Sequence, residues 1–111
     1  KKIIESQATA AAENPFAFGY LLNVLYLYYQ KPTEITIIND KNFELVSSLR
    51  KKFLPESIMV LVANKNNLDA LSKYAFFSGK EFQDDKTNVF VCKNFSCSLP
   101  LSDLSEIEKE L

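Results

Sequence analysis

Three short runs rich in β-branched and apolar residues, separated by segments with helical periodicity, constrain the fold of this chain most. The runs are 34–38, 57–62 and 87–92, and each has the length and composition of a β-strand. The connecting segments are too long for hairpin turns. The alternation therefore predicts an α/β fold, a small three-layer sandwich whose mostly parallel three-stranded sheet has right-handed connections and helices on both faces.

The segments between and after the strands are expected to form three helices and one irregular stretch. Asp40 is placed to cap the first helix and Ser102 the last, while a short helix runs from Leu68 to about Tyr74. The stretch 75–85 lacks periodicity, and its phenylalanines are expected to plug the sheet edge. The apolar positions are Phe43, Val46, Leu49 and Phe53 in the first helix, Leu101, Leu104, Ile107 and Leu111 in the last, and Phe76, Phe77 and Phe82 in the irregular stretch.

The first thirty residues contain no strand-like run and predict a helical hairpin (1–30) preceding the α/β unit (31–111). Asn14 is expected to cap the second helix, and Pro15 fits its first position, where a missing N–H costs nothing. The helix from Pro15 to Gln30 is apolar nearly all round, which predicts burial on two sides. It is too short and too polar for a membrane span.

The composition excludes several classes of function. Basic and acidic side chains number 13 and 14 and are interspersed, so no charged surface is offered to nucleic acid or an anionic membrane. The absence of histidine removes the usual general base, the serine and cysteine triads and most zinc sites. Two distant glycines, Gly19 and Gly79, form no phosphate-binding loop. We therefore expect no metal, no cofactor, no nucleic acid partner and no membrane association.

The segment Asn88-Val-Phe-Val-Cys-Lys-Asn-Phe-Ser-Cys-Ser-Leu-Pro100 runs from a strand into C-x4-C-x2-P and a final amphipathic helix. It resembles the C-terminal end of the YyaL-type, spermatogenesis-associated thioredoxin-domain proteins. The helix from Asn14 and the strand Pro32-Thr-Glu-Ile-Thr-Ile-Ile38 are compatible with that resemblance. The chain departs from the family at Asn39, where many members have glycine.

The resemblance implies a place in a longer protein rather than a reaction. In that family a thioredoxin-like domain is followed by an α/α toroid, and a small α/β unit closes the chain. Residues 1–30 would correspond to the end of the toroid, and the thioredoxin-like dithiol would lie upstream. We expect the chain to be a fragment of such a protein. The lack of a long apolar segment after Lys1 and Lys2 predicts a cytoplasmic location.

Cys92 and Cys97 are the candidate redox residues, and several interpretations of the pair are open. A disulfide closing this short loop would contribute about 2 kcal/mol. A catalytic dithiol normally uses C-x-x-C at a helix N-terminus, and zinc needs about four ligands. The remaining interpretation, a buried reduced pair that packs as small hydrophobes, is the one we expect in a cytosolic protein.

The strands end in polar residues that are candidates for a ligand site. In a parallel sheet these ends share one edge, where two lysines and several amides could hold a small anion. The alternative is that the same residues are ordinary caps and turn residues. The edge candidates are Asn39, Asp40, Asn64, Lys65, Lys93 and Asn94.

These observations predict a non-catalytic accessory or interaction domain, with a thiol-linked redox or regulatory domain using Cys92 and Cys97 as the alternative. The expected partner is the remainder of the longer protein, its thioredoxin-like domain and toroid. Self-association through the helix 15–30 is the other expectation, because a three-stranded sheet covers only one of its two apolar faces.

Overall fold

The computed structural model describes residues 1–111 and separates into two compact units, Lys1–Pro32 and Thr33–Leu111. The first unit consists of helix α1 (Lys2–Glu13), the 3-10 turn η1 (Pro15–Phe18) and helix α2 (Gly19–Gln30). Proline opens η1, as expected, but the expected helix from Pro15 starts as a 3-10 turn and Asn14 makes no side-chain capping bond. None of the helices is long and apolar enough to cross a membrane.

Helix α2 is not buried on two sides, which corrects the expectation for it. None of its residues is buried, and Phe16 in η1 and Tyr20 in α2 are 98% and 85% exposed. Within its unit α2 has only α1 to pack against, and the alanines of α1 offer little apolar area. Ala11 is the buried residue of α1. The first unit therefore presents a surface rich in tyrosine and phenylalanine.

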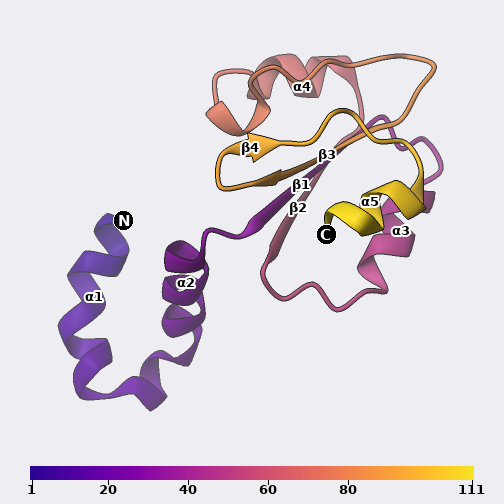
Figure 1. Cartoon of the computed structure of the whole chain (residues 1–111). Coiled ribbons are helices and arrows are strands. Elements are labelled where there is room, and N and C mark those ends of the chain that lie inside the picture. Colours follow the sequence, from indigo (N-terminus) through magenta and orange to yellow (C-terminus); the bar gives the residue numbers. More distant parts are fainter. The chain divides into compact units, whose positions relative to one another are not determined.

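The second unit is built on a four-stranded mixed sheet with strand order β2-β1-β3-β4 (Figure 1). Its strands are β1 (Thr33–Ile38), β2 (Ser57–Val62), β3 (Asn88–Lys93) and β4 (Ser96–Cys97). Strands β1 and β2 are parallel, with Ile38 beside Val62. Strand β3 is antiparallel to β1, with Ile38 beside Asn88, and β4 is antiparallel to β3.

The α/β class is confirmed, whereas the mostly parallel three-stranded sheet is wrong in its third strand. After η2 (Ala75–Phe77) the chain returns along residues 78–87 to the edge where β1 ends, so β3 starts beside the end of β1. A fourth strand follows through the two-residue turn Asn94-Phe95. Both residues have positive φ (50° and 66°), the pattern of a type I′ hairpin turn.

Helices cover both faces of the sheet. Helices α3 (Glu44–Arg50) and α5 (Leu104–Glu110) pack on one face, and helix α4 (Lys65–Leu71) and η2 supply residues to the other. The side-chain alternation of strands separates the two apolar clusters. The buried members of the first are Ile35, Ile37, Val46, Leu49, Val89, Val91 and Ile107, and those of the second are Ile38, Val62, Leu68, Phe77, Phe90 and Cys92.

Several boundaries differ from the sequence expectation. Helix α3 is shorter than its apolar spacing predicts. Phe43 precedes the helix and has a left-handed backbone, and Phe53 follows the helix. Both side chains are exposed. The short helix begins at Lys65, three residues before its predicted start at Leu68. The aromatics of 75–85 do not plug a sheet edge, since Phe76, Phe77 and Phe82 pack on the face that carries Ile38.

Candidate functional site

The strand ends do not all meet at one edge. Because β1 and β2 are parallel, Asn39, Asp40, Asn64 and Lys65 follow strands that end on the same side. Strand β3 runs in the opposite direction, so Lys93 and Asn94 lie at the other ends of the strands. The prediction that they lie beside the other four candidates is wrong. The start of β3 takes their place beside the end of β1.

Asn39 holds the segment before β3 in place by hydrogen bonds. Its backbone adopts φ 63°, a left-handed conformation that asparagine and glycine tolerate best. Its Nδ2 donates to the carbonyl oxygens of Gln83 (2.7 Å), Asp84 (3.2 Å) and Lys86 (3.4 Å). Thr87 Oγ1 donates to the Asn39 carbonyl oxygen (2.9 Å). Asn39 thus supplies a side chain that binds the loop before β3.

The next two edge candidates act as helix caps. Asp40 is buried, and its Oδ2 accepts from the backbone N–H of Val46 (3.0 Å) near the start of α3. Asn64 precedes α4, and its Oδ1 accepts from the backbone N–H of Asn67 (2.9 Å). Each side chain satisfies a helical N–H that has no partner inside the helix.

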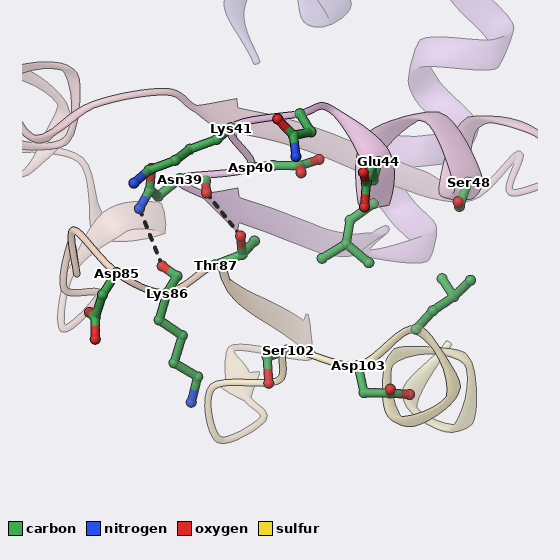
Figure 2. A pocket seen from close by; sticks show the side chains of 13 residues that line it. Asn39, Asp40, Lys41, Glu44, Ser48, Asp85, Lys86, Thr87, Ser102 and Asp103 are labelled. Carbon is green, nitrogen blue, oxygen red and sulfur yellow. Dashed lines mark hydrogen bonds between the residues drawn. The ribbon is translucent and has the colours of Figure 1, made fainter.

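A cavity of about 540 Å³ opens at the edge where β1 ends and β3 begins (Figure 2). Glu44 and Ser48 of α3 lie across the opening from Ser102 and Asp103 before α5. Its charges do not favour an anion, since four carboxylates face two ammonium groups. One of these, Lys41 Nζ, donates to the Asp84 carbonyl oxygen (2.8 Å). The charged lining residues are Asp40, Lys41, Glu44, Asp85, Lys86 and Asp103.

The cysteines lie at a second site, where β3 and β4 pair. Cys92 and Cys97 are directly opposite in the register, their Cα atoms are 3.9 Å apart, and a disulfide joins them. Cys92 is 2% exposed, whereas Cys97 is exposed. The expectation of a buried reduced pair is therefore wrong for the reduced state and for the burial of Cys97, whereas Cys92 is buried as expected. The reason is the unforeseen strand β4, which lines Cys97 up beside Cys92 at the sheet's edge.

The amine of Lys80 lies against this disulfide. Its Nζ is 3.9 Å from Cys97 Sγ and donates a hydrogen bond to the Phe76 carbonyl oxygen. The amine also lies 5.2 Å from the centre of the Phe76 ring and 5.7 Å from that of Phe90. Burial lowers the pKa of Lys80, and the negative charge of Glu34 raises it in part.

Sequence reasoning missed Lys80 because it lies in an aperiodic segment, 17 residues from Cys97. The one signal in the sequence is its place among the phenylalanines 76, 77 and 82, which bury this segment against the sheet.

A smaller cavity of about 290 Å³ adjoins Cys97 and Lys80. Asn88 lines it and is 2% exposed. Asn88 Nδ2 donates to Gln83 Oε1 (3.3 Å), but Asn88 Oδ1 has no hydrogen-bond partner. A buried acceptor without a partner is costly to the fold.

These features define a small mixed α/β domain that carries a cross-strand disulfide beside a half-buried lysine amine. The chain is similar to human Spermatogenesis-associated protein 20, with 24% identity over 101 residues. The match covers 87% of this chain and 13% of the human protein. It supports a distant relation to that family, as the C-x4-C-x2-P segment predicted. No protein-family model and no solved structure matches the chain.

Proposed function

We propose that this chain is a non-catalytic accessory domain of a longer protein that also holds a thioredoxin-like domain and an α/α toroid. Its helical unit, Lys1–Pro32, packs against the helices of that protein. The observation that carries the proposal is the apolar exposure of η1 and α2, where Phe16 and Tyr20 are almost fully in solvent.

The exposed apolar side chains of η1 and α2 favour burial against a partner surface. An aromatic side chain that moves out of water gains about 2 kcal/mol, and this unit has several such side chains on one short segment. Helices that are apolar around most of their circumference normally lie between two packing partners. The large exposed apolar side chains of η1 and α2 are Phe16, Tyr20, Leu22, Val24, Tyr26, Tyr28 and Tyr29.

The occupant of this surface is taken to be the same protein rather than a foreign one. The human relative is several times longer than this chain, which spans 13% of it. Layered helix pairs, as in a toroid, offer an apolar helical face of matching kind.

Hydrogen exchange tests this docking. In the longer protein the amides of α2 should exchange at least tenfold more slowly than in residues 1–111 alone, because packing removes local opening. Equal exchange of α2 in the two proteins contradicts the proposal.

Self-association of residues 1–111 is the second readout. Without the rest of the protein, the exposed face is expected to pair with itself at micromolar concentration in sedimentation equilibrium. Tyr20→Lys should abolish the association. Phe53→Lys is the matched control, since Phe53 is 90% exposed but lies in the other unit. Equal loss of association in both variants would contradict a role for α2.

A second candidate function is a thiol-linked redox or regulatory domain that uses Cys92 and Cys97. The observation that favours it is the asymmetry of the disulfide, which joins a buried cysteine to an exposed one whose sulfur lies near an amine. Alkylation and mass spectrometry of the native chain, with and without dithiothreitol, test it. Cysteines that stay blocked after native treatment with dithiothreitol would contradict it.

A further inference from the structure

The two sulfurs of the disulfide differ in what can reach them. Cys92 lies in the apolar cluster with Phe77 and Phe90, whereas Cys97 lies on the edge strand β4 and lines the 290 Å³ cavity. Thiol–disulfide exchange needs an in-line approach to one sulfur, so access decides which sulfur reacts.

Resting on the thiol-linked candidate function, we propose that Cys97 is the sulfur that exchanges with an external dithiol, and that the Lys80 ammonium stabilises the Cys97 thiolate. Cys92 is then the internal sulfur that closes the disulfide. Lys80 is a positioning residue for this chemistry, since it acts on the charge of Cys97 and forms no bond.

The exchange balances as two displacements. A thiolate of the external dithiol attacks Cys97 Sγ, which forms a mixed disulfide and breaks the Cys92–Cys97 bond. Cys92 leaves as a thiolate and takes up the proton that the second thiol of the dithiol gives up. The second sulfur of the dithiol, now a thiolate, then attacks the dithiol sulfur that is bonded to Cys97. This closes the disulfide of the dithiol and releases the Cys97 thiolate. The external dithiol is oxidised to a disulfide, and the cysteine pair is reduced.

The Lys80 amine lies beside the Cys97 sulfur, which carries the negative charge when the thiolate is released. Its hydrogen bond to the Phe76 carbonyl oxygen and its contacts with the Phe76 and Phe90 rings hold the amine 3.9 Å from Cys97 Sγ. A nearby cation favours the thiolate over the thiol and lowers a cysteine pKa.

Lys80 is the cation in contact with Cys97 Sγ, whereas the amine of Lys93, in the next register pair, donates to the Leu111 carbonyl oxygen (3.1 Å). Glu34 of β1 pairs with Cys92, which pairs with Cys97, and all three side chains lie on the same face of the sheet. Glu81 lines the cavity beside Lys80. Both carboxylates oppose the thiolate, and removal of Lys80 leaves their repulsion uncompensated.

The first experiment isolates Cys97 in the Cys92→Ser chain and follows its alkylation by iodoacetamide from pH 5 to 10. We expect Lys80→Gln to raise the midpoint of the rate profile by about one pH unit and to slow alkylation at pH 7 about threefold, after allowance for lower nucleophilicity of a low-pKa thiolate. Lys80→Arg should retain the low midpoint. Lys86→Gln is the matched control, because Lys86 is exposed and lines the other cavity.

An unchanged midpoint in Lys80→Gln overturns the role of Lys80. The same comparison is made in the reduced chain that keeps both cysteines, which gives a result even if the Cys92→Ser variant does not fold. In that reduced chain, peptide mapping should find Cys97 labelled at least tenfold faster than Cys92. Faster labelling of Cys92 overturns the assignment of Cys97. If the native disulfide resists dithiothreitol while Lys80 still shifts the Cys97 profile, the candidate function fails and the Lys80 assignment stands.

Discussion

Asn39 combines a left-handed backbone with a side chain that holds three carbonyl groups of the 83–86 segment. Asn39→Gly keeps that backbone unstrained but removes the hydrogen bonds, and Asn39→Ala also adds strain. We expect the free energy of unfolding to fall by about 1–2 kcal/mol in the glycine variant and by about 1 kcal/mol more in the alanine variant. Urea unfolding measures both.

The control for this pair is Asn66→Ala at an exposed position of helix α4, which should change the unfolding free energy by less than about 0.5 kcal/mol. Glycine and alanine variants of equal stability would mean that the backbone conformation contributes nothing. In that case the hydrogen bonds alone would account for the choice of asparagine.

Asp103 gives α5 a pH-dependent cap. Hydrogen bonds from the Ser105 hydroxyl and backbone N–H hold the pKa of Asp103 below its ordinary value of 3.8. A pKa that is lower in the folded state stabilises the fold above the unfolded value, and this stabilisation is lost as the pH falls through the folded value. Asp103→Asn should therefore be less stable than the parent at pH 7, and the gap should narrow as the pH falls below 3.8. A gap that widens on acidification would contradict the cap.

At the scale of elements, the sequence predicted where strands lie better than how they run. Ile35 to Ile38 and Met59 to Val62 form parallel strands as their apolar runs predict. The direction of β3 could not be predicted, because an aperiodic segment such as 78–87 looks the same whether it crosses the sheet or returns along one edge. The candidate site was mispredicted for the same reason. Lys93 lies at the opposite ends of the strands because β3 is antiparallel, and Lys80 lies near Cys97 only through tertiary packing.

The β3–β4 turn escaped prediction because Phe95 stands where hairpins of this type favour glycine. Its φ of 66° costs a side-chain-bearing residue about 1 kcal/mol. Phe95→Gly should therefore raise the unfolding free energy by about 0.5–1 kcal/mol, since the phenylalanine is 93% exposed. Thermal unfolding of the oxidised chain measures it. A loss of stability would show that the exposed ring stabilises the hairpin more than its backbone strain costs.

The disulfide closes the same hairpin and should have a modest effect on stability. Cys97→Ser removes a loop closure of six residues, which is worth about 2 kcal/mol in the chain-entropy model. The parent chain in dithiothreitol should match the serine variant in oxidising buffer. A variant destabilised by more than about 4 kcal/mol would indicate that the pair is essential to the fold, and would argue against reversible exchange.

At the scale of the whole molecule, the two units differ in what holds them together. Both apolar clusters consist of residues from Thr33–Leu111, and they lie on opposite faces of one sheet. Unit Lys1–Pro32 has two helices of 12 residues and one buried residue among them, Ala11. Helices of that length are marginal in water without packing. The second unit thus contains both apolar clusters in full, whereas the first unit buries little apolar area of its own.

Residues 31–111 are therefore expected to fold alone. In urea they should unfold in one transition. Their free energy of unfolding should be within about 1 kcal/mol of that of residues 1–111, because no member of either cluster is lost. They should also stay monomeric, since the exposed aromatic surface is gone. Residues 1–32 alone should show weak helical circular dichroism that rises with concentration as the apolar faces associate. A non-cooperative transition in 31–111 would mean that the helical unit stabilises the sheet, and it would then be an integral part of the fold rather than a docking element.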